Sequence, residues 1–145
     1  MKRIFLSAAL AAVAVPSIAQ DTTREIVSKP DAADFTRAEA AVAPIIALIE
    51  AEKMQEAIQA AASGSPLFAS KRAELTSLGG QARSAVDVYG PVEQCVLQSR
   101  DYTTELRFHL KYVCQHRDLL IQWKFNVDKL PGGMTITNVS FSDTF

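Results

Sequence analysis

The sequence predicts an α+β domain in which N-terminal helices pack on a curved, four-stranded antiparallel β-meander. Three observations predict this fold class. Apolar residues recur at helical spacing through the first half of the chain, whereas the segments after Pro91 alternate apolar and polar residues with a period of two. The strand segments follow the helical ones and carry a single apolar face. The chain has 145 residues, the length of one domain with enough apolar content for a core.

The first nineteen residues have the pattern of a secretory signal peptide. Lys2 and Arg3 provide a positive start, Ile4–Val15 is apolar, and Ser17 and Ala19 place small residues at the −3 and −1 positions of a cleavage site. The apolar segment of about twelve residues is too short to span a bilayer. We therefore expect cleavage after Ala19 and a mature chain that is periplasmic or secreted, with no membrane span.

Residues 20–30 are polar, lack periodicity and end in a proline, so they are expected to form a flexible leader before a single domain over residues 31–145. Removal of the signal peptide leaves thirteen basic and sixteen acidic residues, a net charge of −3. This charge argues against a cationic nucleic-acid binder, and no nucleic-acid partner is expected.

Two helices are expected next. The first begins near Asp31 and carries an apolar stripe, with Pro44 marking either a kink or the first turn of a new helix. The second covers Lys53–Ala62 and ends at Ser63–Pro66. The stripe of the first helix consists of Phe35, Ala38, Val42, Ile45, Ile46 and Ile49.

The segment over residues 67–89 is ambiguous. Most of its apolar residues keep a helical spacing, whereas Val86 and Val88 alone would suit a strand, and the longer pattern favours a helix. Gly79 and Gly80 then fall inside it, at a cost of about 1 kcal/mol each relative to alanine. They indicate either close packing on the sheet or a break between two helices.

The strands are expected over residues 92–99, 106–115, 121–127 and 134–142. A turn at Arg100–Thr103 separates the first two, and Leu130–Gly133 separates the last two. The alternation places six residues on the inward face: Leu106, Phe108, Leu110, Ile121, Trp123 and Phe125.

Five segments carry a resemblance to a known family: Tyr89–Glu93, the alternation over Leu106–Tyr112, Leu120–Phe125, Gly132–Gly133 and Asn138–Phe141. In these, the mature chain resembles the nuclear-transport-factor-like, or ketosteroid-isomerase-like, superfamily, and small exported bacterial proteins of uncharacterised role. The resemblance implies a cone-shaped, cystatin-like arrangement and a sheet face that mediates dimers, so a homodimer is one expectation. This fold class hosts enzymes, ligand binders and interaction modules. Its enzymes place an Asp or His and a Tyr inside the cone, where this chain offers Tyr112 among apolar residues.

Four aromatic residues, Phe108, Tyr112, Trp123 and Phe125, are candidates to line an apolar ligand pocket at the open end of the cone. The alternative is that they fill the core.

A second set, Arg107, His109, Lys111 and Lys124, is expected on the outward face of two adjacent strands. It could form a docking surface for an anionic ligand or a protein partner. The alternative is the ordinary polar side of a half-buried sheet.

Cys95 and Cys114 are the only cysteines. An even number in an exported chain favours a disulfide. A turn centred on Asp101 and Tyr102 would instead place Cys114 about 20 Å beyond the position opposite Cys95. The sequence leaves both a structural disulfide and two buried thiols open.

No residue pattern predicts a catalytic group, a metal site or a cofactor. His116 is expected in a surface turn, without metal-ligand spacing. The favoured function is an exported, non-enzymatic module that binds a small apolar ligand or a protein partner. The alternatives are an isomerase- or dehydratase-like enzyme, with Tyr112 as the polar group of its site, and a structural accessory protein of the cell envelope.

Overall fold

The computed structural model describes residues 29–145, so the predicted signal peptide and most of the predicted leader lie outside the described residues. None of the helices in residues 29–145 is both long and apolar enough to cross a membrane. The helical part comprises α1 (Ala32–Glu50), α2 (Met54–Ser63), the 3₁₀ turn η1 (Pro66–Phe68) and α3 (Arg72–Tyr89). The strands are β1 (Val92–Thr104), β2 (Arg107–His116), β3 (Leu120–Leu130) and β4 (Gly133–Ser142).

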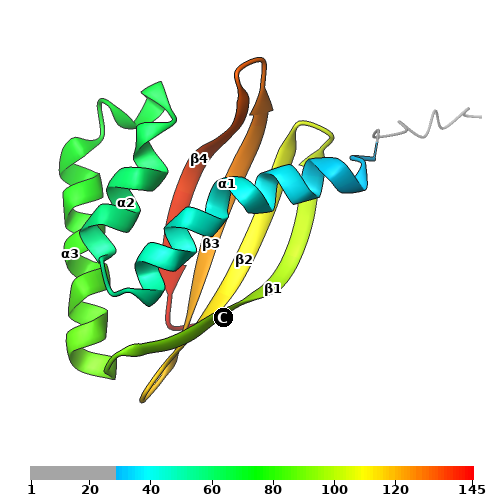
Figure 1. Cartoon of the computed structure of the whole chain (residues 1–145). Helices are drawn as coiled ribbons and strands as arrows, with labels where there is room; N and C mark the ends of the chain where they lie inside the picture. Colours follow the sequence, from blue (N-terminus) through cyan, green and yellow to red (C-terminus); the bar gives the residue numbers. More distant parts are fainter. Residues whose placement is uncertain (1–28) are drawn as a thin grey trace, which may run out of the picture.

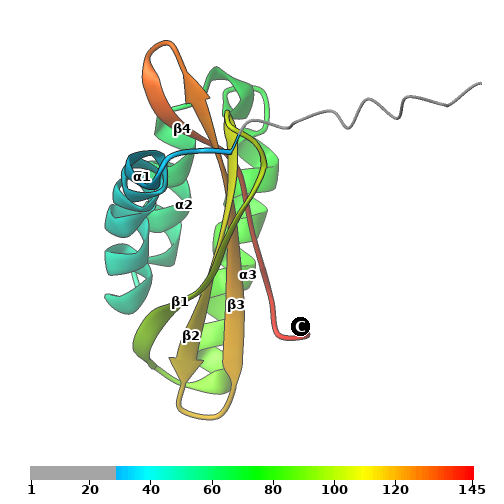
Figure 2. The same cartoon turned by 90° about the vertical axis from the view of Figure 1, so that its right-hand side faces the viewer.

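The four strands form one antiparallel meander in the order β1-β2-β3-β4. Helix α1 crosses one face of this sheet, α2 continues the same layer, and α3 packs against α2 beside the β4 edge (Figure 1). Seen along its edge, the sheet carries α1 and α2 on one side, and the opposite side is not covered by them (Figure 2). The predicted α+β fold class is confirmed.

Helix α1 begins where its first turn can be capped. The side chain of Asp31 accepts a hydrogen bond from the Asp34 backbone N–H at 2.6 Å, which satisfies one of the free donors of the helix start. The predicted apolar stripe, apart from the half-buried Phe35, is buried on the sheet. The helix continues through Pro44 to Glu50, so the proline does not start a new helix.

Helix α3 confirms the helical interpretation of the ambiguous segment, and the strand over Val86 and Val88 is wrong. Gly79 lies at the contact with α2, because a Cβ atom built on it would lie 2.9 Å from the Gln55 Cδ atom. Gly79 thus leaves room for the end of the Gln55 side chain of α2, whereas the sequence suggested close packing on the sheet or a break between two helices. The break is wrong, because α3 is continuous from Arg72 to Tyr89.

The core lies between α1, α2 and the inner faces of β2 and β3. Phe108, Trp123 and Phe125 are its largest fully buried side chains. The Phe35 ring of α1 meets Phe108 edge-on, with 5.3 Å between ring centroids. Leu106 was expected on this inward face, but it lies in the tight turn before β2 and is 52% exposed.

A buried carboxylate joins the start of α1 to β3. Asp34 is only 3% exposed, and its carboxylate accepts hydrogen bonds from Arg37 and from the Lys129 ammonium, the latter at 2.9 Å. These two hydrogen bonds hold the pKa of Asp34 below its ordinary value of 3.8. The charged form of Asp34 therefore favours the folded state.

We predict that Asp34→Asn lowers the thermal midpoint at pH 7 and that its deficit narrows as the pH falls below about 4. Because the folded-state pKa is lowered, the stabilisation is complete above the unfolded-state pKa and is lost as the pH falls through the folded-state value. Thermal unfolding of both proteins at pH 7, 4 and 3 checks this. Asp87→Asn, which removes an exposed ion pair with Arg83 on α3, is the control and should change little. A deficit that is constant over this range would contradict the prediction.

Candidate functional site

The four aromatic residues predicted to line a pocket lie in the core. Trp123 and Phe125 are stacked with 6.5 Å between ring centroids, and Tyr112 meets Phe125 edge-on at 6.1 Å. Phe108 is fully buried beneath Phe35. The cavity described below, between α2 and α3, is lined by other side chains. A ligand-binding role for these four residues stays a prediction.

Tyr112 is the polar member of this set and is 9% exposed. Burial is the main cause that raises the pKa of its phenol, and the negative charge of Glu39 on α1 adds to it. The Glu39 carboxylate accepts a hydrogen bond from Arg100 of β1 at 3.0 Å. The phenol of Tyr112 is thus protonated near neutral pH. The Glu39 carboxylate, whose charge raises the pKa of this phenol, is held in an ion pair by Arg100.

The predicted basic residues lie on the sheet face opposite the helices. Arg107 donates two hydrogen bonds to Asp128, at 2.7 and 2.6 Å. The His109 ring lies between the Thr103 hydroxyl, 2.6 Å from Nε2, and the Asn126 side-chain oxygen, 2.8 Å from Nδ1. These two basic side chains are held by neighbouring strands.

Lys111 and Lys124, unlike Arg107 and His109, are not held by side chains of neighbouring strands within residues 29–145. The register of β2 and β3 places these two lysines directly opposite each other, where like charges destabilise a sheet. Neither takes part in an ion pair within residues 29–145. The middle of the outward face therefore carries an uncompensated positive pair.

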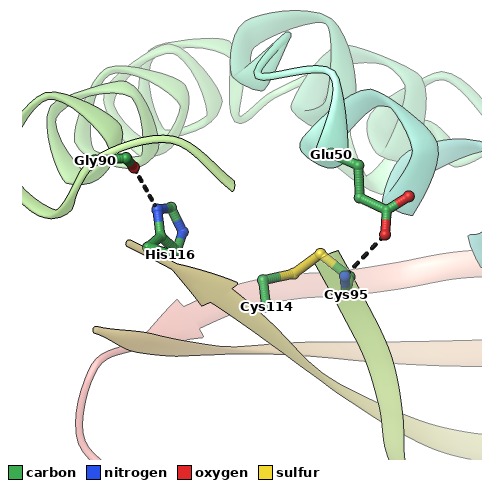
Figure 3. Close-up of a disulfide and its surroundings, with 5 residues drawn as sticks. All are labelled: Glu50, Gly90, Cys95, Cys114 and His116. Carbon is green, nitrogen blue, oxygen red and sulfur yellow. Dashed lines mark hydrogen bonds between the residues drawn. A yellow bond between two sulfur atoms is a disulfide. The ribbon is translucent and has the colours of Figure 1, made fainter. Parts of the chain in front are cut away.

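Cys95 and Cys114 form a disulfide between β1 and β2 (Figure 3). They are direct partners in the register, with 4.0 Å between their Cα atoms. The predicted turn at residues 100–103 is wrong, because β1 continues to Thr104 and Tyr102 pairs with Phe108. The later turn brings Cys114 opposite Cys95 and removes the offset of about 20 Å that the earlier turn implied.

Two carboxylates of the α1 end cover the free edge of β1. The Cys95 backbone N–H donates to the Glu50 carboxylate at 2.8 Å (Figure 3), and the Val92 N–H donates to Glu52 at 3.3 Å. These donors point away from β2 and would otherwise need water or a partner strand. The disulfide and the two carboxylates tie β1 to both of its neighbours.

His116 was expected at the surface but is 3% exposed. It is the last residue of β2, and its Nδ1 lies 2.9 Å from the Gly90 carbonyl oxygen, which joins the end of β2 to the loop after α3 (Figure 3). Because a carbonyl only accepts, this hydrogen bond requires a proton on Nδ1. The residue therefore has a structural contact that its place in the sequence did not indicate.

A cavity of about 680 Å³ lies between α2, η1 and α3. Its apolar wall includes Ala62, Phe68 and Leu75, and its polar wall includes Gln59 and Arg72. The remaining lining residues are Gln55, Ser63, Gly64, Ser65, Pro66, Ala69 and Thr76.

The loop between α2 and α3 builds this cavity. The Ser65 side chain accepts from the Leu67 backbone N–H at 3.4 Å, and Pro66 opens η1 with its fixed backbone angle. Phe68 is thereby directed inward, whereas Leu67 beside it is 61% exposed. Sequence reasoning missed this cavity, although the helix break at Ser63–Pro66 followed by two large apolar residues was an available signal.

Searches of protein-family models, curated proteins and solved structures give no match to this chain. The resemblance to the nuclear-transport-factor-like superfamily stays a prediction, and the site has to be interpreted from its own geometry.

We predict that replacing both cysteines by alanine lowers the free energy of unfolding by about 3 kcal/mol. The bridge closes a loop with a sequence separation of 19, and cross-linking a loop of this length removes about that much chain entropy from the unfolded state. Urea unfolding of the oxidised protein and the double variant measures the difference. The reduced parent protein is the control, and its free energy of unfolding should match that of the double variant. A difference in the free energy of unfolding below about 1 kcal/mol between the oxidised protein and the variant would contradict the prediction.

We also predict that Lys111→Glu raises the free energy of unfolding by about 0.2–1 kcal/mol. The substitution turns a like-charge cross-strand pair into an opposite-charge pair with Lys124. Thermal unfolding at low salt measures the gain, which should shrink in 1 M salt. Lys111→Glu combined with Lys124→Glu restores a like-charge pair and should lose the gain. A single variant that is less stable than the parent would overturn this account of the pair.

Proposed function

We propose that this protein is an exported, non-enzymatic module that binds a small apolar ligand in the cavity between α2, η1 and α3. The observation that carries the proposal is this cavity of about 680 Å³, which has both an apolar wall and a polar wall. Small-molecule sites typically have about 300–1,000 Å³ and combine apolar surface with polar groups that orient the ligand.

The arrangement of the loop supports the proposal. The loop that separates α2 from α3 buries Phe68 at one end of the cavity and leaves Leu67 exposed. Gly79 of α3 lies against the end of the Gln55 side chain of α2, and Gln55 also lines the cavity. An apolar ligand that covers the apolar wall of this cavity would gain burial.

The proposed location follows from the cysteines and the N-terminus. The Cys95–Cys114 disulfide, together with the absence of a membrane-crossing helix in residues 29–145, fits an extracellular location. We propose cleavage after Ala19 and a periplasmic or secreted mature protein.

A second candidate function is docking of an anionic partner, including a protein, on the sheet face that carries Arg107, His109, Lys111 and Lys124. The uncompensated pair of Lys111 and Lys124 favours it. We do not propose a reaction at Tyr112. The carboxylate whose charge raises the pKa of its phenol belongs to Glu39, and it forms an ion pair with Arg100.

The experiment uses Nile red, a neutral apolar dye, with protein produced from the full chain in an exporting bacterial host. We expect saturable binding of one dye per protein, and Ala69→Trp should weaken it at least tenfold by filling the cavity wall. Ala73→Trp is the matched control, because Ala73 is exposed on α3 and does not line the cavity.

Native mass spectrometry of the same protein tests for a co-purified small molecule that is lost on denaturation. Equal dye binding by both tryptophan variants would contradict the proposed site. No saturable binding to the parent protein would contradict the function and favour a structural accessory protein of the envelope.

A further inference from the structure

We infer that the ligand of the α2–η1–α3 cavity is an aliphatic carboxylate, with Arg72 binding its carboxylate and the apolar wall covering its chain. This inference rests on the proposed function and adds the chemical class of the ligand.

The charge of the cavity wall indicates the charge of the ligand. Arg72 is the single charged residue among the side chains that line the cavity in residues 29–145. The other lining groups are apolar or neutral polar. A wall with one positive charge and no carboxylate favours an anionic ligand and disfavours a cationic one.

Arg72 differs from the other arginines of the described chain in its ion pairing. Residues 29–145 contain six arginines, and five of them form an ion pair with Asp or Glu: Arg37, Arg83, Arg100, Arg107 and Arg117. Arg72 takes part in no ion pair within this part of the chain. Its guanidinium is thus free to bind an external anion.

The shape of the Arg72 guanidinium indicates which anionic group of a ligand would bind it. A guanidinium is planar and matches a carboxylate with two parallel hydrogen bonds. Arg72 is exposed at the first turn of α3, whereas Phe68 is buried in the apolar wall. A ligand that meets both must have a hydrated anionic head and an apolar chain, which is the chemistry of an aliphatic carboxylate.

The test compares three amphiphiles with the same chain: dodecanoate, 1-dodecanol and dodecyltrimethylammonium. Displacement of Nile red at pH 8 measures their affinities for the parent protein, Arg72→Gln and Arg83→Gln. Arg83 is the matched control, because it lies on the same helix and pairs with Asp87 outside this cavity. Thermal unfolding of each variant checks that it is folded.

We expect dodecanoate to bind about tenfold more tightly than dodecanol to the parent protein and to Arg83→Gln, since a charge-assisted hydrogen bond contributes about that much. Dodecyltrimethylammonium should bind more weakly than both. Arg72→Gln should remove the difference between acid and alcohol. Decanoate should bind more weakly than dodecanoate, by about fourfold for each CH₂ group that the cavity no longer buries.

The outcomes separate this inference from the proposed function. If dodecanol binds as tightly as dodecanoate and Arg72→Gln changes neither affinity, the cavity still binds apolar ligands and the carboxylate assignment is overturned. If Nile red and all three amphiphiles fail to bind the parent protein, the proposed function is overturned together with the inference.

Discussion

Burial of the aromatic face of the sheet beneath α1 and α2 is the constraint on which the rest of the structure depends. Phe108, Trp123 and Phe125 fill the space between the layers, and the isoleucines of α1 close it from above. Protein interiors are close-packed, with few voids larger than a water molecule. The two candidate binding surfaces outside this layer are the helix pair and the outward face of the sheet.

No residue of the edge strand β1 is fully buried by this packing, and one disulfide and two hydrogen bonds hold the strand in place. The disulfide joins it to β2, and the Glu50 and Glu52 carboxylates join its free N–H groups to the end of α1. Glutamates at a helix C-terminus are unfavourable for the helix dipole, so their value lies in covering the strand edge.

The two candidate binding surfaces are built by different physical means. Within residues 29–145, the helix pair offers a cavity with an apolar wall and one charged lining residue, Arg72, that forms no ion pair. The outward sheet face is polar, and Lys111 and Lys124 face each other there while Arg107 is matched by Asp128. Apolar burial favours the first as the ligand site, because a flat polar face removes little ligand surface from water.

The periodicities of the sequence by themselves determined the order of helices and strands, the inward set from Phe108 onward and the outward position of the basic residues. They did so because burial of one face imposes a period on each element. The position of the turn before β2, and with it the pairing of Cys95 with Cys114, was decided by tertiary structure, since packing of Tyr102 on Phe35 extends a segment whose polar residues resemble a turn. The burial of His116 depends in the same way on the Gly90 carbonyl, and the cavity at Arg72 depends on how two helices separate. The cysteine pairing and the burial of His116 join residues distant in sequence, which no local pattern encodes, whereas the helix break at Ser63–Pro66 was a local signal of the cavity.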